Sequence, residues 1–281
     1  MANALMSQPT GVTASPEKPD DLGIDRAFLI GMARIPFIAV LWAAAAWLAS
    51  LAVQKFGWYH VMIETDSTGA QKEVLFNLGP IAIICIGMLL AAWIDGYAFK
   101  VPNWVTLSLV MSGWYIGILH SFGVLELIPG APVNPGGIGA ALAGTAMGFF
   151  LLFPALFIRG MGQGDVKMTM GFGSWIFAYF GFSLGILVLL WSFAIGVIIG
   201  GIFGLVIMVL RRQLHKNLSN FREIATDLQV LVTAGPAKAA ERAESRKQSW
   251  WRLPYGVPLC AGFLLYLTDY FFFGFLSSLI S

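Results

Sequence analysis

Long apolar runs alternate with short polar segments along most of this chain. Several runs exceed eighteen residues, which lets a helix cross the roughly 30 Å hydrocarbon core of a bilayer. The pattern predicts an all-α fold: a polytopic membrane helix bundle of about seven transmembrane spans. We place the spans at residues 35–53, 75–94, 103–127, 136–158, 166–181, 183–210 and 257–279. The fifth span is short, and its break from the sixth falls near Phe180–Ser183.

The positions of the basic residues predict which way the bundle faces. Nine of the seventeen Lys and Arg residues fall between residues 211 and 252, and such residues accumulate on the cytoplasmic side of membrane proteins. Counting outward from that loop, six more lie on the same side: Lys18, Arg26, Arg34, Lys100, Arg159 and Lys167. Only Lys55 and Lys72 lie on the external side of the membrane. We therefore expect a cytoplasmic N-terminus and an external C-terminus.

This orientation divides the chain into four parts. We expect a disordered cytoplasmic tail at 1–25, six spans with the functional core at 26–210, a basic cytoplasmic loop at 211–252 and a last span at 253–281. The loop between the first two spans, residues 54–74, is then external.

Composition agrees with a membrane protein. Charged residues make up 11% of the chain and mean hydropathy is +0.76, whereas soluble domains carry roughly 25% charged residues. A net charge of +2 gives no sign of a nucleic-acid partner, so the lipid bilayer is the expected surrounding. Cys85 and Cys260 both lie in apolar runs and no CxxC occurs, so we expect neither a metal nor another cofactor.

Acidic residues at membrane depth are costly and mark candidate functional sites. Four stand near the predicted spans: Asp95, Glu126, Asp165 and Asp269. The predicted orientation puts Asp95 and Asp165 together at the cytoplasmic side. Glu126 and Asp269 lie toward the outer side, where we expect a structural or interfacial role.

Two carboxylates at one level suit aspartic proteolysis. A close pair shares one proton. One member then activates a water as general base while the other hydrogen-bonds the scissile carbonyl. His60, His120 and His215 fall in different segments, so neither a catalytic triad nor a metal cluster is indicated.

The residues around each Asp add specificity. Gly160, Gly162 and Gly164 precede Asp165, and alternating glycines allow torsions and close approaches that other residues forbid. Such backbone at a helix start must be buried in protein or line a wet cavity. A flexible turn with Asp165 as N-cap is the alternative. After Asp95, Pro102 favours a short turn before a new helix.

These segments together resemble the type IV prepilin peptidase family. The Pro102-Asn103-Trp104-Val105-Thr106-Leu107 segment is similar to the one that follows the first catalytic Asp of that family. The Gly160-to-Lys167 string is similar to its Gly-Met-Gly-x-Gly-Asp-x-Lys motif. Pro254-Tyr255-Gly256-Val257-Pro258 is similar to a weaker feature before its last span.

The resemblance implies that Asp95 and Asp165 are the catalytic pair. Gly160, Gly162 and Gly164, with Pro102 and Asn103, would then shape the backbone beside the substrate. Lys167 would either favour the ionised form of Asp165 or anchor the helix end at the lipid headgroups. Larger members carry an insertion with two CxxC pairs, zinc and methyltransferase activity. This chain lacks those cysteines, so a protease alone is expected.

The implied function is removal of a short basic leader from a prepilin-like membrane precursor, for pilus or type II secretion pseudopilus assembly. The site would lie at the cytoplasmic face of the inner membrane, and pilus or secretion assembly proteins are candidate partners. A catalytically inactive assembly scaffold is one alternative. A proton-coupled transporter is another, although transporters bring acids near the bilayer midplane.

Overall fold

The computed structural model describes residues 26–65, 71–99, 101–129, 136–157, 161–210 and 255–273, together with residues 226, 229 and 233. The expected N-terminal tail at 1–25 and almost all of the basic loop at 211–252 lie outside these residues. The two predictions about those segments therefore stay predictions.

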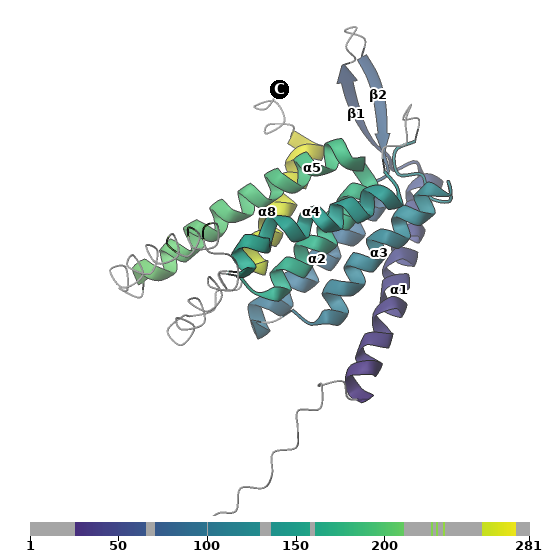
Figure 1. Cartoon of the computed structure of the whole chain (residues 1–281). Coiled ribbons are helices and arrows are strands. Elements are labelled where there is room, and N and C mark those ends of the chain that lie inside the picture. The colour runs from purple at the N-terminus through teal and green to yellow at the C-terminus, as the bar shows by residue number, and fades with distance from the viewer. Residues whose placement is uncertain are drawn as a thin grey trace, which may run out of the picture.

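The described chain is predominantly helical (Figure 1). Its helices are α1 (Arg26–Phe56), α2 (Leu78–Ala98), α3 (Asn103–Ser121), α4 (Ile138–Phe157), α5 (Gln163–Leu210) and α8 (Gly256–Thr268), which continues as the π-helix η2 (Asp269–Phe273). Two strands, β1 (His60–Thr65) and β2 (Gln71–Phe76), form an antiparallel hairpin.

Five of these helical stretches are long and apolar enough to cross a membrane: Leu29–Phe56, Leu78–Ala98, Ile138–Leu156, Gln163–Val206 and Gly256–Phe273. The helical membrane fold predicted from the sequence is thereby confirmed. Helix α3, whose sequence carries several Ser, Thr and His residues, is not among the five. The count of seven spans and the orientation of the termini stay predictions.

Helix α5 contains a sharp break at Gly181, where φ is 75° and ψ is −171°. Only glycine adopts this backbone conformation readily. Thr169 and Phe172 from the first half of α5 line one cavity with Leu189 and Ser192 from the second half. Residues before and after Gly181 therefore face each other in reverse order, so the two halves run antiparallel. The break lies within the boundary predicted at Phe180–Ser183.

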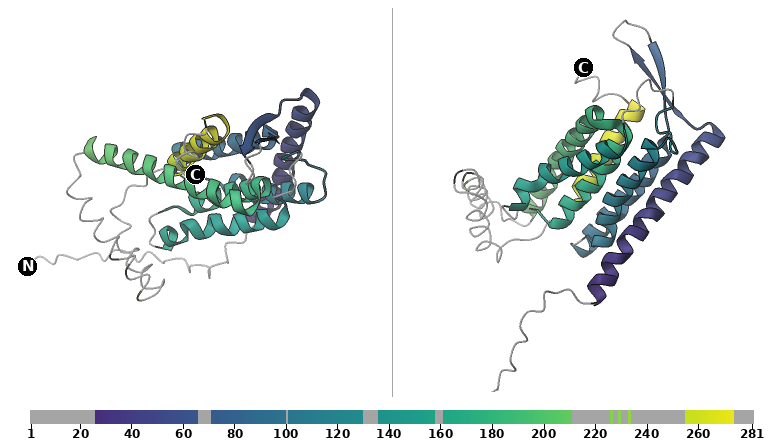
Figure 2. Two further views of the ribbon diagram at one scale, coloured as in Figure 1. Left: turned by 90° about the horizontal axis from the view of Figure 1, so that it is seen from above. Right: turned by 45° about the vertical axis from the view of Figure 1, so that its right-hand side comes forward.

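Three details differ from the sequence-based expectation. Residues 54–74, expected as a loop, contribute to the β1–β2 hairpin, whose strands alternate side chains between two faces. The helix expected over 103–127 ends at Ser121, because Gly123 takes a positive φ of 69° and turns the chain. Helix α1 begins at Arg26 instead of residue 35, and Figure 2 shows it along the outside of the bundle.

Helix α5 packs against α3, α4 and α8. Its contact with α4 is made through glycines: a Cβ on Gly148 would lie 2.5 Å from the Thr169 carbonyl oxygen, and Gly144 and Gly173 face each other as closely. Small residues of this kind let membrane helices approach without a hydrophobic driving force. On α3, the indole Nε1 of Trp175 donates to the Leu109 carbonyl and the Ser112 hydroxyl, both at 2.9 Å. These contacts fix the first half of α5, and with it Asp165.

Candidate functional site

Asp95 lies in the last turn of α2, which Phe99 closes in the left-handed conformation with φ of 52°. The Asp95 side chain is only 6% exposed. Its Oδ2 accepts a hydrogen bond of 2.9 Å from the backbone N–H of Gly256, the first residue of α8. A residue 161 positions away along the chain thus holds the Asp95 carboxylate in place.

Asp165 is the third residue of α5 and is 5% exposed. Its Oδ2 accepts a hydrogen bond of 3.2 Å from the backbone N–H of Gly162, just before the helix. Asp165 therefore lies inside the first turn and reaches back toward the loop, instead of being the N-cap residue that the alternative reading required. The N-terminal end of a helix also favours a negative charge.

The structure brings the two carboxylates together. Asp95 and Asp165 lie within electrostatic range of each other, and the Gly256 N–H that donates to Asp95 also interacts favourably with Asp165. The pair is therefore built from three elements: the end of α2, the start of α5 and the start of α8. In Figure 1 the turn from α2 to α3 lies at the end of the bundle opposite the hairpin.

Tyr255 stands beside the pair, immediately before α8. Burial raises the pKa of its phenol above the ordinary value, and the negative charge of Asp165 raises that pKa further. Tyr255 therefore stays neutral at neutral pH.

The two loops that carry the sequence motifs are joined directly. The ammonium of Lys167 donates a hydrogen bond of 2.8 Å to Oδ1 of Asn103. A Cβ on Gly164 would lie 3.4 Å from the Val101 backbone nitrogen, so the two loops are in close contact. Pro102 is the extended N-cap of α3, with φ of −66° and ψ of 147°. Gly160 lies outside the described residues.

This geometry gives Lys167 a role that the sequence did not suggest. Its recorded partner is Asn103, so it ties the start of α5 to the start of α3. The two roles expected from the sequence, stabilising ionised Asp165 or anchoring the helix end at lipid headgroups, did not include this bond.

Exposed aromatic side chains surround this end of α2. Trp93 is 79% exposed and Tyr97 is 88% exposed, and Phe99 and Trp104 are also exposed. Aromatic rings gather where membrane proteins cross from lipid to water. The pair of carboxylates therefore lies at the depth of a membrane interface, near one end of the helices that carry it.

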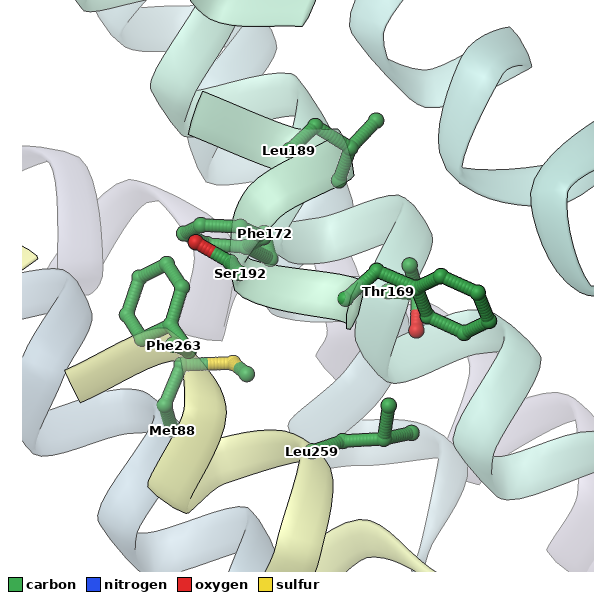
Figure 3. A pocket seen from close by; sticks show the side chains of 8 residues that line it. Met88, Thr169, Phe172, Leu189, Ser192, Leu259 and Phe263 are labelled. Carbon is green, nitrogen blue, oxygen red and sulfur yellow. The ribbon is translucent and has the colours of Figure 1, made fainter. Parts of the chain in front are cut away.

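A cavity of about 20 Å³ lies one helical turn deeper (Figure 3). Met88 of α2, both halves of α5 and Leu259 and Phe263 of α8 line it. One lining residue, Thr169, follows Asp165 by one turn and donates its hydroxyl hydrogen to the Asp165 carbonyl at 3.0 Å. The cavity is mostly apolar and has the size of one water molecule.

The other two acidic residues are not part of this site. Glu126 follows α3, whose nineteen residues span about 28 Å from Asn103, so it lies near the opposite end. Asp269 begins η2, beyond the end of α8. His120 is buried and donates from Nδ1 to the Leu125 carbonyl at 2.8 Å. Within the described ranges, no three His, Cys, Asp or Glu residues form a group that could hold a metal ion.

A profile of the type IV leader peptidase family matches residues 82–205, a segment that contains both Asp95 and Asp165. This core belongs to the type IV leader peptidase family. The resemblance read from the two Asp motifs is thereby confirmed, and the chain is a membrane protein with a leader peptidase core. Comparisons with curated proteins and with solved structures found no match.

Two residues of this candidate site, Tyr255 and Gly256, were not among the candidates chosen from the sequence. Both belong to the Pro254-to-Pro258 motif, which entered the sequence analysis only as a weaker feature of the resemblance. They also lie beyond the segment matched by the family profile. The signal available was the motif itself, at the entrance to the last span.

Proposed function

We propose that this chain is an aspartic endopeptidase that removes the short basic leader of a prepilin-like membrane precursor. The observation that carries the proposal is the pair of buried carboxylates, Asp95 and Asp165, brought together from two helices at a membrane interface. Membership of a leader peptidase family supports the choice of a peptide substrate.

The hydrogen bonds suggest how the work is divided. In each carboxyl group the Oδ2 atom is held by a backbone N–H, from Gly256 for Asp95 and from Gly162 for Asp165. Neither Oδ1 accepts a hydrogen bond from the described residues, so both are available to a water molecule or the substrate. One ionised carboxylate takes a proton from a water molecule, and the other, protonated, hydrogen-bonds the scissile carbonyl. Water then attacks the carbonyl carbon without a covalent acyl-enzyme.

The location of the pair fits a substrate with a basic leader and an apolar helix. The apolar helix would lie beside the spans in the lipid, and the leader junction would reach the pair at the interface ringed by Trp93, Tyr97 and Trp104. We assign this interface to the cytoplasmic face of the inner membrane, on the basis of the basic residues counted along the sequence. Released subunits would be competent for pilus or secretion pseudopilus assembly.

Co-expression with a prepilin-type precursor tests the proposal. We expect the wild type to remove the leader, seen as a shift in electrophoretic mobility. Asp95→Asn and Asp165→Asn should each abolish that shift, because an amide cannot act as a general base. Glu126→Gln is the matched control: it neutralises an acid of the same chain at the far end of α3 and should cleave normally.

The rival functions predict other outcomes. Cleavage that persists in both single Asn variants would overturn the aspartic mechanism. Pilus assembly rescued by the double Asn variant would indicate a scaffold. Proton-dependent uptake in vesicles that requires Asp165, without cleavage of any precursor, would indicate a transporter.

A further inference from the structure

The N-terminus of α8 lies against the catalytic pair through a residue without a side chain. Gly256 donates its N–H to Asp95 Oδ2 at 2.9 Å, and the same N–H interacts favourably with Asp165. Among the described residues, it is the one backbone N–H that interacts with both carboxyl groups.

The absence of a side chain at Gly256 is what allows this approach. A Cβ built there would lie 2.7 Å from Asp95 Oδ2 and 3.1 Å from both Cβ and Cγ of Asp95. Three atoms of one buried carboxyl side chain cannot all move away together, since Asp95 is 6% exposed. Any larger residue at 256 must therefore rotate Asp95 or push α8 away from α2. Gly256 has no positive φ, so its backbone conformation does not itself require glycine.

The rest of α8 is positioned by a separate contact with the second half of α5. A Cβ on Gly262 would lie 2.5 Å from the Gly196 Cα and 2.6 Å from the Ser192 carbonyl oxygen. Gly200 faces Pro258 in the same way, at 3.3 Å. On the α2 side, a Cβ built on Gly96, the residue after Asp95, would lie 3.4 Å from the Val257 side chain. Helix α8 is thus wedged between α2 and α5, with its first N–H pointing at the pair.

We propose that Gly256 is a positioning residue of the catalytic pair: its N–H sets the orientation of the Asp95 carboxylate relative to Asp165, and its missing side chain makes room for that bond. The proposal rests on the proposed function, since it names a further residue of the same site. It assigns the last span a part in the active site, in addition to the two spans that carry the acids.

The test compares three glycine-to-alanine variants of the purified full chain in detergent. The substrate is the precursor that the wild type cleaves in co-expression. Gly256→Ala should lower kcat by about 100-fold, the cost typical of a catalytic group displaced by about 1 Å. KM should stay within about twofold, because the substrate contacts are unchanged. The melting temperature should stay within a few degrees of the wild type.

Two controls separate positioning from packing. Gly262→Ala adds the same methyl group at the α5 crossing and should lower the melting temperature, with any loss of activity following the loss of folded protein. Gly201→Ala adds a methyl group where nothing lies within 4 Å, and should leave both kcat and stability unchanged.

Each result bears on the proposal. A lower kcat with unchanged KM and melting temperature in Gly256→Ala supports it. A folded Gly256→Ala protein that cleaves at the wild-type rate overturns it, as does a variant whose activity falls only in proportion to its stability. If Asp95→Asn is inactive while Gly256→Ala is fully active, the positioning role fails and the aspartic mechanism stands. If Asp95→Asn cleaves normally, the aspartic mechanism itself fails.

Discussion

The two ends of the helix bundle both bury polar groups, but they use different chemistry. At the hairpin end, Asn77 donates to the Ser50 hydroxyl at 2.7 Å and accepts from the Gly79 N–H at 3.2 Å. The Tyr179 hydroxyl donates to the Asn77 carbonyl at 2.9 Å. At the other end, Asp95 and Asp165 are each held by backbone N–H groups through one oxygen.

The difference separates a structural hydrogen-bond network from the proposed catalytic pair. The hairpin end is a neutral network whose amide and hydroxyl groups satisfy one another across α1, α2 and α5, which is what stabilises a buried polar cluster. The Asp end brings two acids together, and within the described residues Oδ1 of each accepts no hydrogen bond from the protein. Two like charges in a buried site oppose each other. The two adjacent acids therefore lower the stability of the fold, and they are the groups proposed to carry out the chemistry.

Neutralising an acid gives the largest expected difference between the two ends. Asp165→Asn should lower the cleavage rate about 10³-fold or more, within the range known for general acid–base groups. Its melting temperature should equal or exceed that of the wild type, since a neutral amide replaces a buried ionisable group that lies beside another acid. Cleavage kinetics and thermal unfolding on the same preparation check this. A variant that loses folding together with activity would contradict the division between the two ends.

Removing the Asn77 side-chain amide at the hairpin end should lower stability and leave the cleavage rate nearly unchanged. Asn77→Ala deletes the cap of α2 and leaves the Ser50 hydroxyl without this partner, so the free energy of unfolding should fall by about 2–3 kcal/mol. The cleavage rate per folded molecule should stay within about twofold of the wild type. Denaturant unfolding in detergent, followed by kinetics on the folded fraction, measures both. A selective loss of kcat would show that the two ends are coupled.

The hydrogen bond between Lys167 and Asn103 should have a smaller effect. It is exposed, so a double-mutant cycle with Lys167→Met and Asn103→Ala should give a coupling energy of about 0.5–1 kcal/mol. Because the bond joins the loops beside Asp165, each single variant should slow cleavage by less than about tenfold. A coupling near zero would show that the two loops are held together by the Gly164 contact alone.

The smallest expected effect concerns the alkaline stability of the Asp end. Burial and Asp165 raise the pKa of Tyr255 above the ordinary value of about 10. A raised pKa stabilises the fold fully below the unfolded value, and that contribution is lost as pH rises through the folded value. Wild-type stability should therefore decline above about pH 10 more steeply than that of Tyr255→Phe. Melting curves between neutral pH and pH 11 compare the two, and parallel declines would contradict the assignment.

The sequence predicted the apolar helices and the two acids because both signals are local. Hydropathy alone identifies a run such as residues 78–98 as a membrane helix. Asp95 and Asp165 stand out because acids are rare at membrane depth. A break near Phe180–Ser183 was also predicted, because two spans there keep Arg159 and Lys167 on the same side as the other basic residues. The β1–β2 hairpin was missed because its pairing joins residues on either side of a loop, and residues 54–74 were read only for length and charge.

Gly256 shows a different limit of local reasoning. Its contribution is one backbone N–H and an absent side chain, and every residue type except proline carries that N–H. The Gly256 N–H can hold Asp95 only because α8 packs close to Asp95, which lies 161 positions earlier in the chain. Lys167 is similar, because its partner Asn103 lies 64 positions away. Both residues belonged to motifs visible in the sequence, while their contacts depended on the packing.

The chain reversal at Gly181 has a consequence for how the protein enters the bilayer. The tip of the α5 hairpin is Phe180-Gly181-Phe182, and Phe180 is 1% exposed and packs on Phe76 and Phe271. No charged residue lies between Lys167 and Arg211, so no hydrated loop has to be translocated between the two halves. In the orientation predicted from the basic residues, the two halves of α5 can partition into lipid as a single helical hairpin whose open ends stay on the cytoplasmic side. A lysine inserted at the tip would have to be moved across the bilayer core, which would make insertion of the hairpin less favourable.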